Sequence, residues 1–181
     1  MTFCSDKVIF GNLCLMAVMW SVASMNYYVI SFFLKYIPGN IYVNTSISSI
    51  SEIVAYICSG FVLKIFGIKY SFLLSYVLAA IGGAFMVFFS TAGGNWTAFF
   101  VLFAKFGISF AFNIAYLSTP LLFPTRLCST AFGICNVFAR FATILAPIIA
   151  ELKTPVPMLI YSISSVVAGV LCLFITNVRY E

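Results

Sequence analysis

Histidine is absent from this chain of 181 residues, and acidic residues are scarce, with Asp6 the single aspartate among four Asp and Glu. Without histidine, the sequence excludes Ser/His hydrolases and zinc sites with histidine ligands. A single aspartate also excludes an intramembrane protease that uses two. The six cysteines lack the short paired spacing that is typical of metal and redox sites. We therefore expect no enzymatic activity, no cofactor and no metal.

Charge of either sign is rare. Only 7% of the residues are charged, whereas 64% are hydrophobic, and a soluble domain with this composition would leave much apolar surface in water. The composition predicts a protein of the lipid bilayer. The net charge of +5 arises from nine Lys and Arg that are scattered singly, so no basic patch predicts a nucleic-acid partner.

The apolar residues form long runs separated by residues that break helices. A run of about 20 residues matches the hydrocarbon core of a bilayer. Six such runs predict an all-α membrane protein with a single domain over residues 1–181 and six transmembrane helices, at about 11–34, 45–64, 70–90, 97–122, 129–150 and 157–176. The pieces between them carry Gly, Pro and Asn, which favour turns.

The distribution of Lys and Arg predicts the orientation. One side of the expected bundle carries five cations near the span ends: Lys7, Lys64, Lys69, Arg126 and Arg179. The opposite side carries only Lys35 and Lys153. Because cytoplasmic loops are rich in Lys and Arg, both termini are expected in the cytoplasm.

Three charged residues lie inside the expected spans: Glu52, Lys105 and Arg140. A charge at this depth costs about 2.5 to 3.5 kcal/mol, so such residues usually face a polar cavity on a solute or ion path. A structural role is the alternative, because Glu52 and Arg140 can form a purely structural ion pair and the long stem of Lys105 can reach the interface.

Polar residues recur at helical spacing on four of the spans and so form stripes. The stripes comprise Ser21, Ser24, Tyr28 and Ser31; Thr45, Ser48, Glu52, Tyr56 and Ser59; Lys105, Ser109, Asn113 and Tyr116; and Ser129, Asn136, Arg140 and Thr143. We expect these four spans to surround a polar interior, with the spans at 70–90 and 157–176 outside against lipid. Packing of small residues between helices is the structural alternative for the uncharged members.

Several segments resemble one transporter family. The chain resembles organic cation and anion transporters in segments that are similar to their seventh, eighth, tenth and eleventh helices. These segments are residues 13–32 with Tyr27-Tyr28, 38–42 (PGNIY), 52–56 (EIVAY), 105–116 (KFGISFAFNIAY) and 135–147 (CNVFARFATILAP). These transporters belong to the major facilitator superfamily. The loop residues depart from the family pattern, with Leu121 in place of an acid, Cys128 in place of Arg and Lys64 in place of Asp.

The resemblance implies one half of a major facilitator fold, the C-terminal six of twelve helices, built from two inverted repeats of three helices. It also implies that the N-terminal half is supplied by a missing segment or a second copy. The function expected is secondary active transport of small organic ions. The alternative is a truncated membrane protein that does not transport and acts as a partner or regulator of a full-length carrier.

The resemblance and the polar stripes assign roles to six residues of the expected substrate site. Glu52 would accept a cation or a proton, and Arg140 and Lys105 would bind an anionic group or balance Glu52. Hydrogen bonds or ring contacts are expected from Tyr28, Tyr56 and Asn113.

Overall fold

The computed structural model describes residues 7–36, 40–89 and 96–176, and every regular element in these ranges is helical. Arg179, which contributes to the predicted orientation, lies outside the described residues. The same holds for Pro38 and Gly39 of the family resemblance.

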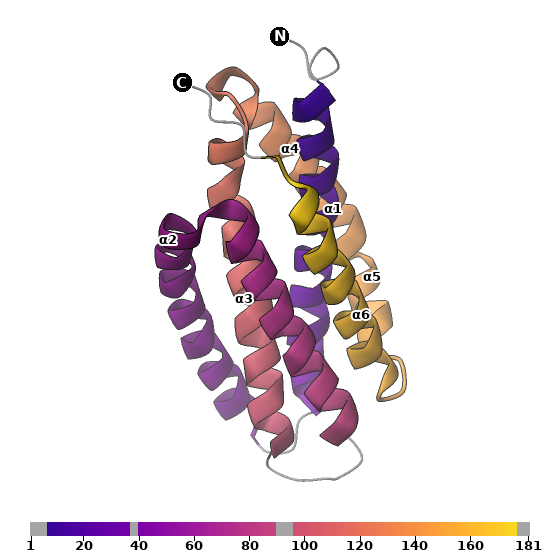
Figure 1. The fold of residues 1–181 in the computed structure, drawn as a ribbon. Helices are drawn as coiled ribbons and strands as arrows, with labels where there is room; N and C mark the ends of the chain where they lie inside the picture. The colour runs from indigo at the N-terminus through magenta and orange to yellow at the C-terminus, as the bar shows by residue number, and fades with distance from the viewer. Residues whose placement is uncertain (1–6, 37–39, 90–95, 177–181) are drawn as a thin grey trace.

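The helices stand roughly side by side in one bundle (Figure 1). They are α1 Lys7–Phe33, α2 Ile41–Phe89, α3 Trp96–Leu122, α4 Thr125–Thr143, α5 Leu145–Ala150 and α6 Val156–Leu171, with the short 3-10 helices η1 Leu34–Tyr36 and η2 Cys172–Phe174. Among the described residues, five helical segments are long and apolar enough to cross a membrane, counting α4 and α5 as one segment.

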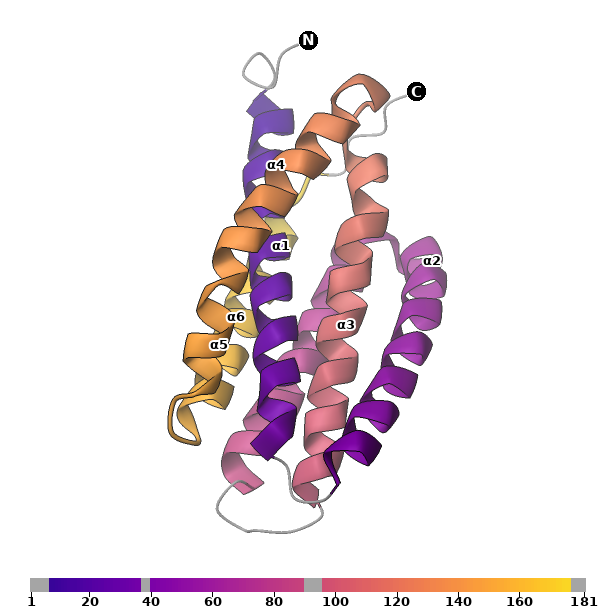
Figure 2. The same ribbon diagram turned by 180° about the vertical axis from the view of Figure 1, so that it is seen from behind.

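Helix α2 consists of two arms that meet at Gly67. Its 49 residues would measure about 74 Å if straight, far more than the hydrocarbon core of a bilayer. Gly67 adopts φ 75° and ψ 179°, a backbone conformation that interrupts the helix and that residues with a Cβ atom rarely adopt. The chain turns back on itself here, so that the arms 41–66 and 68–89 run in opposite directions (Figures 1 and 2).

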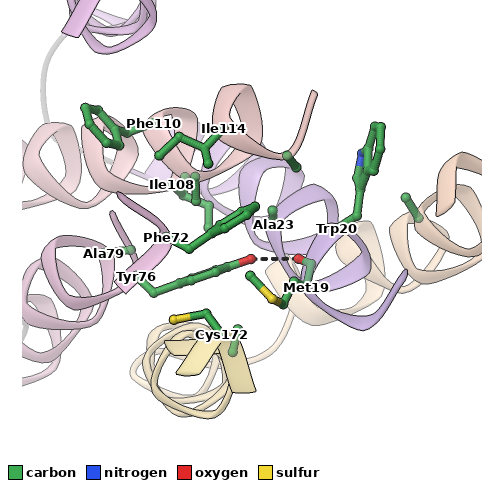
Figure 3. Packing of buried hydrophobic residues seen from close by; sticks show 14 of the residues in the cluster. Met19, Trp20, Ala23, Phe72, Tyr76, Ala79, Ile108, Phe110, Ile114 and Cys172 are labelled. Atoms are coloured by element: carbon green, nitrogen blue, oxygen red, sulfur yellow. Dashed lines mark hydrogen bonds between the residues drawn. The ribbon is translucent and has the colours of Figure 1, made fainter. Parts of the chain in front are cut away.

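The core lies where α1, the second arm of α2, α3 and the end of α6 meet (Figure 3). Phe72 and Tyr76 of α2 are fully buried there, and the Tyr76 hydroxyl donates a 2.7 Å hydrogen bond to the Met19 carbonyl of α1. Because the hydroxyl has a partner, a large ring is buried here without leaving a polar atom unsatisfied.

The second arm of α2 crosses α3 at small residues. A Cβ atom added to Gly82 would lie 2.6 Å from the Cα atom of Ala104, and one added to Gly107 would lie 2.9 Å from the Cα atom of Ala79. Each glycine therefore sits against an alanine of the facing helix. Such pairs let membrane helices approach closely and gain dispersion contacts along their backbones.

Polar side chains join α1 to α6 inside the bundle. Asn26 is fully buried, and its Nδ2 atom donates to the hydroxyls of Ser164 and Ser165 at 2.9 and 3.1 Å. At one end of the bundle, Asn12 pairs with the backbone of Thr176 through bonds of 2.8 and 3.0 Å. These contacts agree with the structural role of uncharged polar residues as links between membrane helices.

The exposed faces of the helices differ in composition. The outward residues of α6 and of the second arm of α2 are apolar throughout their middle turns, for example Ile163, Val166 and Val77. By contrast, the exposed residues of α4 include Arg140, and those of the first arm of α2 include Ser46, Ser49 and Tyr56 among a majority of apolar residues. The first pair of surfaces suits lipid, whereas the second pair carries groups that are costly to leave in hydrocarbon.

Candidate functional site

A buried ion pair joins the first arm of α2 to α3. The Nζ atom of Lys105 lies 2.9 Å from Oε1 of Glu52, and the two side chains are 2% and 18% exposed. Lys105 does not extend to water, because its side chain is 2% exposed and its ammonium contacts Glu52 and the Ser31 hydroxyl inside the bundle. The charge that is costly to place at this depth is therefore met by an opposite charge at hydrogen-bonding distance.

Tyr27 and Ser31 of α1 complete the surroundings of this pair. The Tyr27 hydroxyl donates a 3.0 Å hydrogen bond to Oε2 of Glu52, and the Lys105 ammonium lies over the Tyr27 ring, 3.6 Å from its centroid. Lys105 also donates to the hydroxyl of Ser31. We call Glu52, Lys105, Tyr27 and Ser31 the Glu52–Lys105 cluster; it links α1, α2 and α3 through charge, hydrogen bonds and a cation–π contact.

A row of aromatic rings extends from the cluster along α1 and α3. Tyr27 stacks on Phe112 with ring centroids 5.3 Å apart, and Phe112 meets Tyr116 edge to face at 5.1 Å. Tyr116 in turn contacts Trp20 at 4.7 Å. Each ring restrains its neighbour, so the row fixes the orientation of Tyr27 and with it the position of the cluster.

The remaining candidates from the sequence occupy different positions around the cluster. Tyr28 contacts the cluster through the Tyr27 ring, with 5.4 Å between the ring centroids. Asn113 donates to the Ser59 hydroxyl at 2.6 Å and to the Tyr56 carbonyl at 3.2 Å, so it binds the first arm of α2. The Tyr56 side chain is 37% exposed one turn after Glu52.

Arg140 lies apart from the cluster, on the exposed face of α4. It lines an open hollow of about 520 Å³ together with Gly133, Asn136, Phe141 and neighbouring apolar residues. Among the described residues the structure forms two ion pairs, and neither includes Arg140. The cation that balances Glu52 is thus Lys105, and Arg140 keeps its positive charge uncompensated.

The opposite side of α4 packs on α1 through small residues. Ala131, Cys135 and Ala139 are buried at intervals of four, and the Thr143 and Ser24 hydroxyls are 2.8 Å apart across the two helices. This packing directs Arg140 outward, because it lies one position after a buried alanine.

Two members of the cluster are absent from the six residues chosen from the sequence. The sequence predicts Ser31 as a member of the polar stripe of α1 and indicates Tyr27 through the family resemblance. Tyr27 and Tyr28 are adjacent, so their side chains point about 100° apart around the helix and only one of them can face the cluster directly. The sequence alone does not indicate which one. Helical spacing does not separate the two, because each tyrosine lies three or four positions from both Ser24 and Ser31.

Comparisons with known proteins find relatives among solute carriers. The chain is 28% identical over 172 residues to the solute carrier family 22 member 15-like protein of Xenopus laevis, a match that covers 91% of this chain and 35% of the relative. It is 31% identical over 156 residues to solute carrier family 22 member 13 of Homo sapiens, covering 84% and 28%. The human organic cation/carnitine transporter 2 is 25% identical over 164 residues, covering 87% and 29%. No protein-family model matches the chain.

The chain spans about a third of the length of the curated relatives it matches. These relatives are carriers and not enzymes, and they occupy membranes, in agreement with the long apolar helices. The resemblance predicted from the residues is confirmed: the chain is a multi-pass membrane protein homologous to the solute carrier family 22 transporters, the organic cation and anion transporters of the major facilitator superfamily.

Proposed function

We propose that this chain forms one half of a secondary active transporter for small organic ions. The observation that carries the proposal is the pairing of Glu52 with Lys105, which leaves Arg140 as an uncompensated cation on α4. Charged groups at this depth of a membrane bundle typically mark a solute path. The names of the relatives, which include an organic cation/carnitine transporter, favour an organic ion as the solute.

The proposed half contains six spans. The two arms of α2 count as separate spans, because Gly67 reverses the chain between them. The spans then divide into α1 with the two arms of α2, and α3 with α4–α5 and α6, as expected for two inverted repeats of three helices. The second arm of α2 and α6 would face lipid.

The complementary half would cover the exposed faces that carry polar groups. Helix α4 exposes Arg140, so lipid contact along that face is unfavourable, and the first arm of α2 exposes Tyr56 among apolar residues such as Ile53. Another protein surface, from a longer chain or a second copy, would enclose a polar cavity between the two halves, which is where carriers of this kind bind solutes.

The charges favour a solute with an anionic group. Since Lys105 neutralises Glu52, the net charge of the three groups is that of Arg140 alone. A carboxylate could form a bidentate pair with the Arg140 guanidinium, while Tyr28 and Tyr56 would supply ring contacts and hydrogen bonds. Asn113 would act by holding the first arm of α2, with Ser59 as its partner.

Solute uptake into vesicles tests this proposal. The whole chain would be reconstituted alone and with a full-length relative, and uptake of an organic anion and an organic cation would be measured. Arg140→Ala should reduce anion uptake at least about tenfold or invert the ion preference, whereas the control Lys153→Ala should change neither. Unchanged uptake of both ions by Arg140→Ala would contradict the proposal. A chain that transports nothing but binds the full-length relative would support the regulatory alternative instead.

A further inference from the structure

A long apolar groove runs between α1 and α4, on a different side of α4 from Arg140. It has a volume of about 570 Å³ and is lined on α1 by residues from Phe10 to Val22 and on α4 by Ile134 and Phe138. Cys14 and Ser21 are the weakly polar members of a lining that is otherwise hydrocarbon. The groove therefore suits a chain of methylene groups rather than a polar solute.

The length of the groove matches one leaflet of a bilayer. From Phe10 to Val22 the rise along α1 is about 18 Å, whereas half of the hydrocarbon core measures about 15 Å. The groove begins one turn after the first residue of α1 and stops just before Ser24, whose hydroxyl lies 2.8 Å from that of Thr143. It thus runs from one membrane interface to about the midplane.

Two cations lie at the end where the groove begins. Helices α1 and α4 start at the same end of the bundle and run in the same direction (Figure 2). Lys7 is the first residue of α1, and Arg126 is the second residue of α4. Both side chains are exposed, and neither takes part in the ion pairs of the described residues.

We propose that this groove binds one acyl chain of an anionic phospholipid, whose headgroup phosphate is held by Lys7 and Arg126. Basic residues beside grooves between transmembrane helices favour acidic headgroups over zwitterionic ones, and the chain-length groove beneath them supplies the apolar half of the site. The hollow between the second arm of α2 and α6 is much smaller, about 150 Å³, and Lys69 beside it already donates a hydrogen bond to the carbonyl of Leu173, one of its lining residues. The proposal is independent of the solute that the protein transports.

Lipid retention by the whole chain provides the test. The chain would be reconstituted in vesicles of equal phosphatidylcholine and phosphatidylglycerol, extracted in detergent, and its bound phospholipids counted by native mass spectrometry. We expect one retained phosphatidylglycerol. Lys7→Gln and Arg126→Gln should each lower the ratio of bound phosphatidylglycerol to phosphatidylcholine by about fivefold, while Lys153→Gln, at a cation remote from the groove, should leave it unchanged.

A second pair of variants tests the groove itself. Val18→Trp places a large ring in the groove at a position that is 46% exposed, and Val166→Trp places the same ring on α6 at a position that is 54% exposed. Loss of the bound lipid in the first variant only, with equal helical content by circular dichroism, supports the proposal. Equal retention of both lipids would overturn the proposal, and so would lipid retention that Val18→Trp does not affect. A change in oligomeric state caused by Val18→Trp without a change in bound lipid would also overturn it, because it would indicate a second copy in the groove.

Discussion

The Nζ atom of Lys105 lies 2.9 Å from Oε1 of Glu52 and is held there by a side chain that is 2% exposed. A lysine stem so enclosed cannot move its charge to water when its partner is lost. The pair therefore behaves as one unit, and removal of either member leaves an uncompensated charge inside the bundle.

Replacing Lys105 alone should be far more damaging than replacing both members of the pair. Lys105→Met leaves Glu52 without its cation and should lower the free energy of unfolding by about 3 kcal/mol. The double variant Glu52→Gln/Lys105→Met removes both charges and should recover at least half of that loss. Unfolding in a denaturing detergent measures both; additive effects in the double-mutant cycle would contradict a coupled pair.

Tyr27 should affect stability more than its neighbour Tyr28. Tyr27→Phe keeps the stack on Phe112 but removes the hydrogen bond to the Glu52 carboxylate, which should cost about 1.5 kcal/mol. Tyr28→Phe serves as the matched control, with an expected change within about 0.5 kcal/mol. The two unfolding midpoints, measured in the same detergent, compare the hydroxyls directly, and equal midpoints would argue against the role of Tyr27 in the cluster.

The sequence was sufficient to predict apolar helices that carry Glu52 and Lys105 on polar stripes, because helical spacing alone places each stripe on one face. It was not sufficient to show which cation meets Glu52. Lys105 and Arg140 are both long and both lie inside apolar runs, and the choice between them depends on how the helices cross. Since α3 packs directly on the first arm of α2 and α4 packs on α1, Lys105 is the one that reaches Glu52.

Residues with two compatible roles were the hardest to assign from sequence. Asn113 belongs to a polar stripe, which suits a solute contact, yet its amide donates to Ser59 and to a backbone carbonyl of the facing helix. Asn26 is similarly fully buried between α1 and α6. In both cases a partner on another helix satisfies the amide, and no periodicity within one helix can indicate such a partner.

At the opposite end of the bundle from Lys7, Glu151 forms an ion pair with Lys35 and accepts a 2.7 Å hydrogen bond from Tyr36. Two hydrogen bonds hold the pKa of Glu151 below its ordinary value of 4.5, and the bond from Lys35 has a larger effect than the bond from Tyr36. Because the pKa is lower in the folded state, this contribution to stability is present above pH 4.5 and is lost as the pH falls through the folded value.

Glu151→Gln should therefore lower the unfolding midpoint slightly at pH 7, and the difference from the unmodified chain should shrink below about pH 4. The effect should be small and should weaken in high salt, since both side chains are largely exposed. Lys153→Gln is the control, because Lys153 is absent from the ion pairs of the described residues. A difference that persists unchanged at pH 3 would exclude the carboxylate as its source.

Alanine at Gly82 or Gly107 should disrupt the crossing of α3 with the second arm of α2. The added Cβ atoms would lie 2.6 Å from the Cα atom of Ala104 and 2.9 Å from that of Ala79, so the helices must separate at a cost of about 1 to 3 kcal/mol. Gly60→Ala is the matched control, since a Cβ atom at Gly60 would meet no neighbour within 4 Å and alanine favours the helix by about 1 kcal/mol. Unfolding midpoints should fall for the first two variants and hold or rise for the third. If the Gly82→Ala variant were as stable as the Gly60→Ala variant, the result would contradict the close contact between α3 and the second arm of α2.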